Sequence, residues 1–77
     1  MSTAWDPTNA DRLVAIGMAD SAISSNGGRS WTPLQVPSGT SAATFSADGR
    51  TLYAAVLNDE QVTTFASTDS GQTWTRP

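Results

Sequence analysis

The 77-residue chain contains no cysteine and no histidine. Disulfide bonds, thiolate zinc sites and imidazole metal sites are therefore excluded. Below about 70–80 residues, a domain usually needs a disulfide, a metal or a partner chain to reach useful stability. We expect no metal and no cofactor here, so contact with a further chain is the expected source of stability.

Lysine is also absent, and four arginines stand against seven acidic residues, for a net charge of −3. Nucleic acid binding needs a basic surface and polybasic membrane contact needs clustered cations, so neither partner is expected. No apolar run approaches the roughly 18 residues of a membrane-spanning helix, and no signal peptide is expected. The longest apolar stretch, residues 13–18, suits a strand. The composition does not indicate a compartment.

Helical periodicity is missing as well, because no segment places apolar residues at i, i+3, i+4 and i+7 over a helix length. Short β-prone segments alternate instead with turn residues, and Asp48-Gly49 is a strong hairpin signal. The expected strands are 3–5, 14–16, 22–24 and 29–34 in the first half and 42–46, 51–57, 61–67 and 72–76 in the second. The pattern predicts an all-β fold of two similar halves.

An eight-residue phrase occurs twice in the chain. Residues 24–31 read SSNGGRSW, and residues 67–74, which begin 43 positions later, read STDSGQTW. A repeat period of about 40 residues indicates a supersecondary unit that cannot bury its apolar face alone. Asn26 in the first copy stands where the second copy has Asp69.

The phrase has the properties of a tight turn with an aromatic anchor. Its Asn or Asp side chain can accept hydrogen bonds from nearby N–H groups, and its glycine can adopt a positive φ angle. Its hydroxyl residues can tie the flanks together, and its tryptophan supplies apolar area. The candidate structural residues are Ser24, Asn26, Gly28, Ser30 and Trp31, and Ser67, Asp69, Gly71, Thr73 and Trp74. The phrase supplies no nucleophile and no general base.

These residues resemble the Asp-box, or BNR repeat, whose pattern is Ser/Thr-x-Asp-x-Gly-x-Thr-Trp. Residues 67–74 match it fully, whereas residues 24–31 have Asn26 in place of aspartate and Ser30 in place of threonine. The family includes sialidases, sortilin-like receptors, xyloglucan-cleaving hydrolases and a photosystem assembly factor. The resemblance implies two four-stranded antiparallel β-propeller blades, residues 1–36 and 37–77. In that family the box is structural and links the third and fourth strands at the outer rim.

The aromatic residues favour packing over ligand binding. Trp31 and Trp74 are explained as anchors of the repeated turn rather than as platforms for sugar stacking. Trp5 takes the place in the first half that Phe45 takes in the second, which favours the core between blades over a ligand role. Tyr53 lies in the middle of an expected strand, and these last three aromatics are candidates for either core or ligand contact.

Titratable residues do not converge on a catalytic pattern. Asp59 and Glu60 are neighbours in a turn, where acids are usually solvated rather than paired for glycoside hydrolysis. The four arginines are scattered over turn positions, so the arginine cluster of a sialidase is not expected. The Asp69 carboxylate falls short of the six to eight oxygen ligands of calcium. We therefore expect that the chain is not an enzyme.

Two blades cannot close a propeller ring, and a free pair would expose strand edges and apolar faces. We therefore expect a non-catalytic module that assembles with itself, as a homotrimer with six blades in preference to a homotetramer with eight. A pair of blades excised or engineered from a longer propeller would have the same sequence pattern. The alternative function is a lectin-like propeller that binds glycan between its blades.

Overall fold

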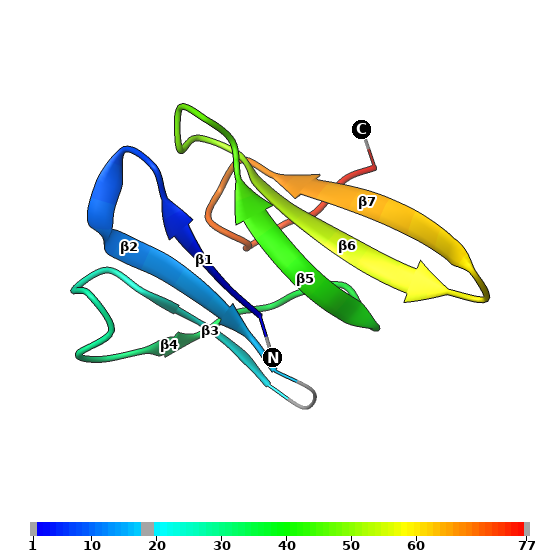
Figure 1. Ribbon diagram of the computed structural model, residues 1–77, viewed down its shortest axis with the longest axis horizontal. Coiled ribbons are helices and arrows are strands. Elements are labelled where there is room, and N and C mark those ends of the chain that lie inside the picture. The colour runs from blue at the N-terminus through cyan, green and yellow to red at the C-terminus, as the bar shows by residue number, and fades with distance from the viewer. Residues whose placement is uncertain (1, 18–19, 77) are drawn as a thin grey trace.

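The computed structural model describes residues 2–17 and 20–76, which form seven strands in two antiparallel sheets (Figure 1). The first sheet has the order β1 (Ser2–Asp6), β2 (Asn9–Ile16), β3 (Ser21–Ser24) and β4 (Thr32–Pro33), and the second has the order β5 (Thr40–Phe45), β6 (Leu52–Asn58) and β7 (Gln61–Ser67). No helix occurs among the described residues, and the expected all-β class is confirmed. Met18, the last residue of the expected apolar strand, and the terminal positions 1 and 77 lie outside them.

Short polar side chains form the turn between β1 and β2. The Asp6 carboxylate accepts hydrogen bonds from the backbone N–H of Thr8 at 2.8 Å and from the Thr8 hydroxyl at 2.7 Å. The side-chain oxygen of Asn9 then accepts from the N–H of Asp11 at 3.0 Å. Such contacts satisfy backbone donors inside a turn, so the chain reverses within a few residues.

Two hairpin turns join the strands of the second sheet. The carboxylate of Asp48 accepts a hydrogen bond from the N–H of Arg50 at 3.0 Å, and Gly49 has a φ angle of +71°. Asp59 and Glu60 join β6 to β7 with φ angles of 47° and 67°. Two consecutive positive φ angles are typical of the type I′ turn, whose twist matches that of the strands on either side.

The fourth strand of each half is shorter than the sequence predicted. The expected strand 29–34 is reduced to β4, and the expected strand 72–76 is reduced to one antiparallel bridge between Ala66 and Thr75. The repeated turn is the reason, because its own side chains bind the N–H groups of Ser30 and Thr73 that a longer strand would use. The second sheet therefore has three strands where four were expected.

The pairing register identifies counterpart positions in the two sheets. Leu13 on β2 and Leu52 on β6 occupy the same level, because each lies opposite an aromatic residue on one side and the first serine of the repeated turn on the other. The counterparts at this level are Trp5 and Phe45, Leu13 and Leu52, and Ser24 and Ser67. Residues 2–36 are called the first unit below, and residues 37–76 the second unit.

One hydrophobic core lies between the two units. Val14, Ile16 and Leu34 of the first unit form a buried cluster with Phe45 and Leu52 of the second. β1 runs beside β5 in the same direction, and the two strands are in contact (Figure 1). Because side chains alternate along a strand, each sheet turns one face to this core. The opposite face is called its outer face.

Candidate functional site

The second copy of the repeated turn is closed by its own side chains. The hydroxyl of Ser67 accepts a hydrogen bond from the N–H of Gly71 at 2.8 Å and donates one to Oδ1 of Asp69 at 2.7 Å. The same Oδ1 accepts from the N–H of Thr73 at 2.9 Å, and Oδ2 accepts from the Thr73 hydroxyl. Ser70 and Gly71 have φ angles of 62° and 88°, so the turn requires two consecutive residues in the left-handed region.

The first copy forms the same network, except that donor and acceptor are exchanged in the hydrogen bond between residue 26 and the hydroxyl of Ser30. The hydroxyl of Ser24 accepts from the N–H of Gly28 at 2.9 Å and donates to Oδ1 of Asn26 at 2.9 Å. Oδ1 of Asn26 accepts from the N–H of Ser30 at 2.9 Å, and Nδ2 donates to the Ser30 hydroxyl at 2.7 Å. Asparagine therefore keeps the geometry of the turn without its negative charge.

Hydrogen bonds also set the charge state of Asp69. The hydroxyl of Thr73 has the largest effect, followed by the Thr73 N–H and the hydroxyl of Ser67, and they lower the pKa of Asp69 from 3.8 to about 2. Donors of this kind favour the ionised carboxylate. A general base works best with a pKa near the operating pH. The low pKa and the occupied oxygens of Asp69 suit a structural role.

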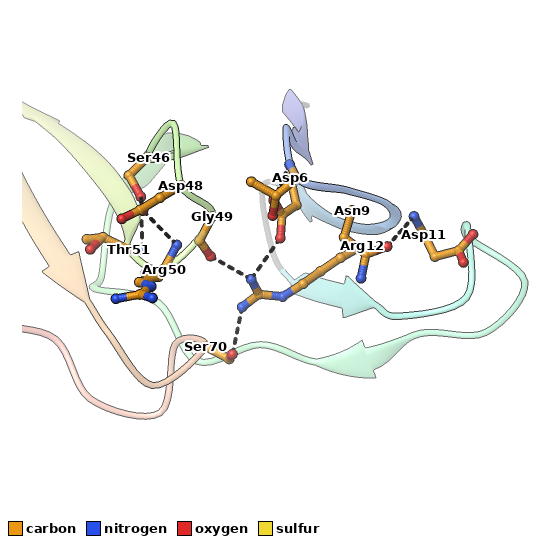
Figure 2. Close-up of polar contacts among 11 residues, drawn as sticks. Asp6, Asn9, Asp11, Arg12, Ser46, Asp48, Gly49, Arg50, Thr51 and Ser70 are labelled. Atoms are coloured by element: carbon orange, nitrogen blue, oxygen red, sulfur yellow. Dashed lines mark hydrogen bonds and ion pairs between the residues drawn. The ribbon is translucent and has the colours of Figure 1, made fainter.

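Arg12 links the turns of both units (Figure 2). Its Nη1 donates to Oδ2 of Asp6 at 3.1 Å and to the carbonyl oxygen of Gly49 at 2.9 Å. Its Nη2 donates to the hydroxyl of Ser70 at 2.7 Å, and the guanidinium carbon lies 4.9 Å from the ring centre of Phe45. One side chain of the first unit thus contacts the β5–β6 turn, the repeated turn and a core aromatic of the second.

The ion pair between Asp6 and Arg12 is mostly buried. The side chain of Asp6 is 4% exposed, and that of Arg12 is 22% exposed. The hydroxyl and N–H of Thr8 lower the pKa of Asp6 most, and Arg12 lowers it further, against the opposing effect of burial. From the sequence, Arg12 was expected to be one of four scattered cations. Two of its partners lie 37 and 58 positions away in the sequence. No local sequence pattern indicates a contact between residues so far apart.

Trp74 and Gly71 connect the second repeated turn to the first unit. The indole N–H of Trp74 donates to the carbonyl oxygen of Gln35 at 2.7 Å, and its ring packs against the core. A Cβ atom on Gly71 would collide with the side chain of Leu34. This glycine therefore serves two needs, a positive φ angle and a close approach of the two units.

In the first unit, the residues at the positions of Phe45 and Trp74 are exposed. Trp5 is 54% exposed, whereas Phe45 is 7% exposed. Trp31 is 42% exposed, whereas Trp74 is half-buried. Trp5 was expected in the core between blades, and within this chain it lies on the surface. The physical reason is that the first unit covers Phe45 and Trp74, whereas the described residues of the second unit do not cover Trp5 and Trp31 in the same way.

The second unit also has an apolar outer face. Tyr53, Ala55 and Leu57 alternate with core positions along β6, and Val62 and Thr64 pair beside them on β7. Leu57 is 61% exposed and Val62 is 66% exposed. An apolar groove of about 210 Å³ runs along Tyr53, Ala55 and Thr64. Tyr53 is therefore half-buried at a groove wall and not in the core.

A second hollow of about 750 Å³ lies beside β4 and the segment that follows it. Trp31, Asp20 and Gln35 contribute to its walls. An exposed indole beside polar side chains is one arrangement that can contact a sugar, because the indole is apolar on its faces and carries an N–H donor.

Within residues 2–17 and 20–76, there is no cluster of three or more acidic residues that could hold a metal ion. The described part of the chain also has no helix long and apolar enough to cross a membrane. Asp59 and Glu60 are both exposed in the β6–β7 turn.

Comparison with known proteins supports the fold and leaves the family open. No family model matches the chain, and no curated protein matches it. Among solved structures, a GH74 enzyme from Niastella koreensis is similar, with a TM-score of 0.79 and 28% sequence identity. The match covers 97% of this chain and 11% of that protein, so the chain spans about a tenth of the enzyme's length. The two antiparallel sheets thus have a propeller-type fold, and the Asp-box resemblance rests on the two repeated turns alone.

Proposed function

We propose that this chain is a non-catalytic pair of β-propeller blades whose role is structural, completed by further blades at both outer faces. One observation carries the proposal. The described residues include four large apolar side chains that are exposed: Trp5 on the outer face of the first unit, Leu57 and Val62 on the outer face of the second, and Trp31 in the first repeated turn. Apolar area gathered on two opposite faces is typical of surfaces that contact other protein.

The junction inside the chain supports this proposal because it shows how one blade covers the next. Phe45 and Trp74 are covered by the first unit, and their counterparts Trp5 and Trp31 have the same positions without that cover. Repetition around a ring supplies the cover in a propeller and leaves only short, protected edges. A further unit before the first would bury the two tryptophans.

The arrangement of acids supports a non-catalytic role. Asp6, Asp48 and Asp69 each accept hydrogen bonds inside a turn, which lowers the pKa of each carboxyl group. Glycoside hydrolysis requires two carboxyl groups that face a substrate, one of them with a raised pKa. The activity of the GH74 enzyme is not transferred, because the match covers 11% of that protein.

A tandem protein tests the proposal. Two copies of the chain joined by a flexible linker contain one additional junction of blades, so we expect a higher urea midpoint than for the single chain and less acrylamide quenching of tryptophan. The matched control has Trp5→Ser in the second copy, which removes the central side chain of the added junction. Equal midpoints for the tandem, its control and the single chain would contradict the proposal.

A second candidate function is carbohydrate binding at the hollow beside β4. The exposure of Trp31 and the presence of Asp20 and Gln35 on the same walls favour it. A glycan array tests this function, with Trp31→Ala as the variant and Val62→Ala, at an exposed position of the second unit, as the control. Binding that depends on Trp31 but not on Val62 would support a lectin-like role, and a silent array would exclude it.

A further inference from the structure

We infer that the partner of each outer face is a second copy of this chain, docked head to tail. The Trp5 face of one copy lies on the Tyr53 face of the next, and a ring of three copies has the six blades expected from the sequence. The inference rests on the proposed function and deepens it by naming the partner. It concerns two surfaces, here called the first outer face (Trp5 and Trp31) and the second outer face (Tyr53, Ala55, Leu57, Val62 and Thr64).

The contact continues an interface that already exists within the chain. The inner face of the first unit presents Val14 and Ile16 to Phe45 and Leu52. At the second outer face, the register places Tyr53 and Ala55 at the positions of Val14 and Ile16. The second outer face is therefore the counterpart of the inner face of the first unit, which the second unit covers. The first outer face, which contains Trp5, is the counterpart of the inner face of the second unit, which contains Phe45.

The two outer faces are complementary in size. Trp5 is larger than its counterpart Phe45, so a blade that covers it must provide more room. Ala55 is smaller than its counterpart Ile16, and the second outer face has the apolar groove of about 210 Å³ at this place. The larger side chain on one face therefore meets the smaller one on the other, as close packing requires.

The two faces are also complementary in polarity. None of the residues that define them is charged, and the groove is bordered by alanine, threonine and tyrosine. Contact among these residues thus desolvates no charged side chain, which would otherwise oppose association. A two-fold contact of Trp5 with Trp5 would place two bulky rings against each other and leave the groove empty. The head-to-tail arrangement fills it.

One difference from the internal junction predicts how firmly the copies hold together. The register places Thr51 at the position of Arg12, so a junction between copies has no counterpart of the guanidinium that binds Gly49 and Ser70. The copies should therefore separate on dilution while each chain stays folded. A concentration series distinguishes this behaviour from unfolding.

Sedimentation velocity and native mass spectrometry test the inference. The wild-type chain is expected to form a trimer at high concentration. Trp5→Asp disables the first outer face and Val62→Asp disables the second, and both positions are more than half exposed, so the fold should survive in each. Leu57→Asp is a second variant of the same face. Each variant alone is expected to be a folded monomer, with association weakened at least about tenfold.

An equimolar mixture of Trp5→Asp and Val62→Asp provides the decisive measurement. In a head-to-tail contact, each of the two has one intact face, so the mixture should give a one-to-one dimer and nothing larger. Ser25→Asp adds the same charge at an exposed position outside both faces and should leave the trimer unchanged. A wild-type chain that is folded by circular dichroism and monomeric up to millimolar concentration would overturn docking of a second copy, as would a mixture without the dimer.

The outcome is separable from that of the proposed function. The tandem protein supplies additional blades covalently, so its stability reports on blade packing even where separate copies do not associate. A stabilised tandem with a monomeric single chain would retain the proposed function and reject the second copy as the partner. A tandem without any gain would reject both.

Discussion

The indole N–H of Trp74 donates a hydrogen bond of 2.7 Å to the carbonyl oxygen of Gln35, which belongs to the other unit. The corresponding indole of Trp31 lines an open hollow. Two tryptophans that occupy the same place in a repeated phrase thus have different neighbours. The difference separates what the repeated turn needs for itself from what the junction of the units needs.

Trp74→Phe should destabilise the chain, whereas Trp31→Phe should not. Phenylalanine keeps most of the ring contact but loses the N–H donor, and a hydrogen bond of this kind is worth about 0.5–1.5 kcal/mol. We therefore expect a loss of about 1 kcal/mol for Trp74 and less than about 0.5 kcal/mol for Trp31. Urea unfolding of the two variants measures both. Equal losses would show that the bond to Gln35 adds nothing to the junction.

Gly71→Ala should cost more than Gly28→Ala. Both glycines have φ angles near +90°, at 88° and 91°, so each alanine carries a backbone strain of about 1–2 kcal/mol. A Cβ on Gly28 would lie 3.5 Å from the Trp31 ring, an ordinary contact, whereas a Cβ on Gly71 would collide with Leu34. We expect an additional loss of about 1–3 kcal/mol for Gly71 from this overpacking.

A double-mutant cycle with Leu34→Ala identifies the cause of that additional loss. If the collision is responsible, Gly71→Ala should cost less in the Leu34→Ala background than in the wild-type chain. Additive losses would assign the whole effect to backbone strain.

Arg12→Ala should be the most damaging single change among the four arginines. It removes three hydrogen bonds and leaves the buried Asp6 carboxylate without its cation. Loss of one partner from a mostly buried ion pair supports an estimate of about 2–4 kcal/mol. Arg29→Ala, at an exposed position, is the control and should change stability by less than about 0.5 kcal/mol. Similar midpoints in urea for the two variants would contradict the role of Arg12 in the junction.

Asp69→Ala should destabilise the chain more than Asn26→Ala. Both side chains accept from the N–H group four residues on, but the Asp69 bonds are charge-assisted and therefore stronger. Asp69 also closes the turn that contacts the first unit through Gly71. Thermal unfolding of the two alanine variants measures the order, and equal losses would refute it.

Acid should weaken the second repeated turn and not the first. The pKa of Asp69 in the folded chain is about 2, below its ordinary 3.8, so its contribution is complete above about pH 4 and is lost as the pH falls towards 2. The difference in unfolding free energy between the wild-type chain and Asp69→Asn should therefore shrink from pH 5 to pH 2. Asp6 and Asp48 are present in both proteins, so their titration cancels in this difference. A difference that is constant with pH would contradict the low pKa.

The sequence predicted the strands well where local chemistry decides them. Asp48-Gly49 and the β-branched run before Ser67 gave the hairpins of the second sheet close to their observed bounds. The equivalence of Trp5 and Phe45 also agrees with the pairing register. These features depend on the alternation of apolar and polar residues and on turn residues, and both signals are present within a few neighbouring positions of the sequence.

The sequence could not predict which member of an equivalent pair is buried. Trp5 and Phe45 have the same place in their sheets, and their exposure differs because only Phe45 has a unit in front of it. The role of Arg12 was missed for a related reason, since its partners come from three separate turns. The fourth strands were overestimated because the residues before Thr75 bind the turn's own side chains.

The close approach of Leu34 to Gly71 implies that the order of the two repeats cannot be exchanged without loss. The first repeat carries the long side chains that reach across, Arg12 and Leu34, and the second carries the small surfaces that receive them, Gly71 and Ser70. In a permuted gene that encodes the second repeat first, Leu34 and Arg12 would no longer meet Gly71 and Ser70 within one chain, and that contact would depend on a second copy. The first repeat thus supplies the long side chains of the junction and the second repeat supplies the small residues that receive them, although both repeats contain the same turn.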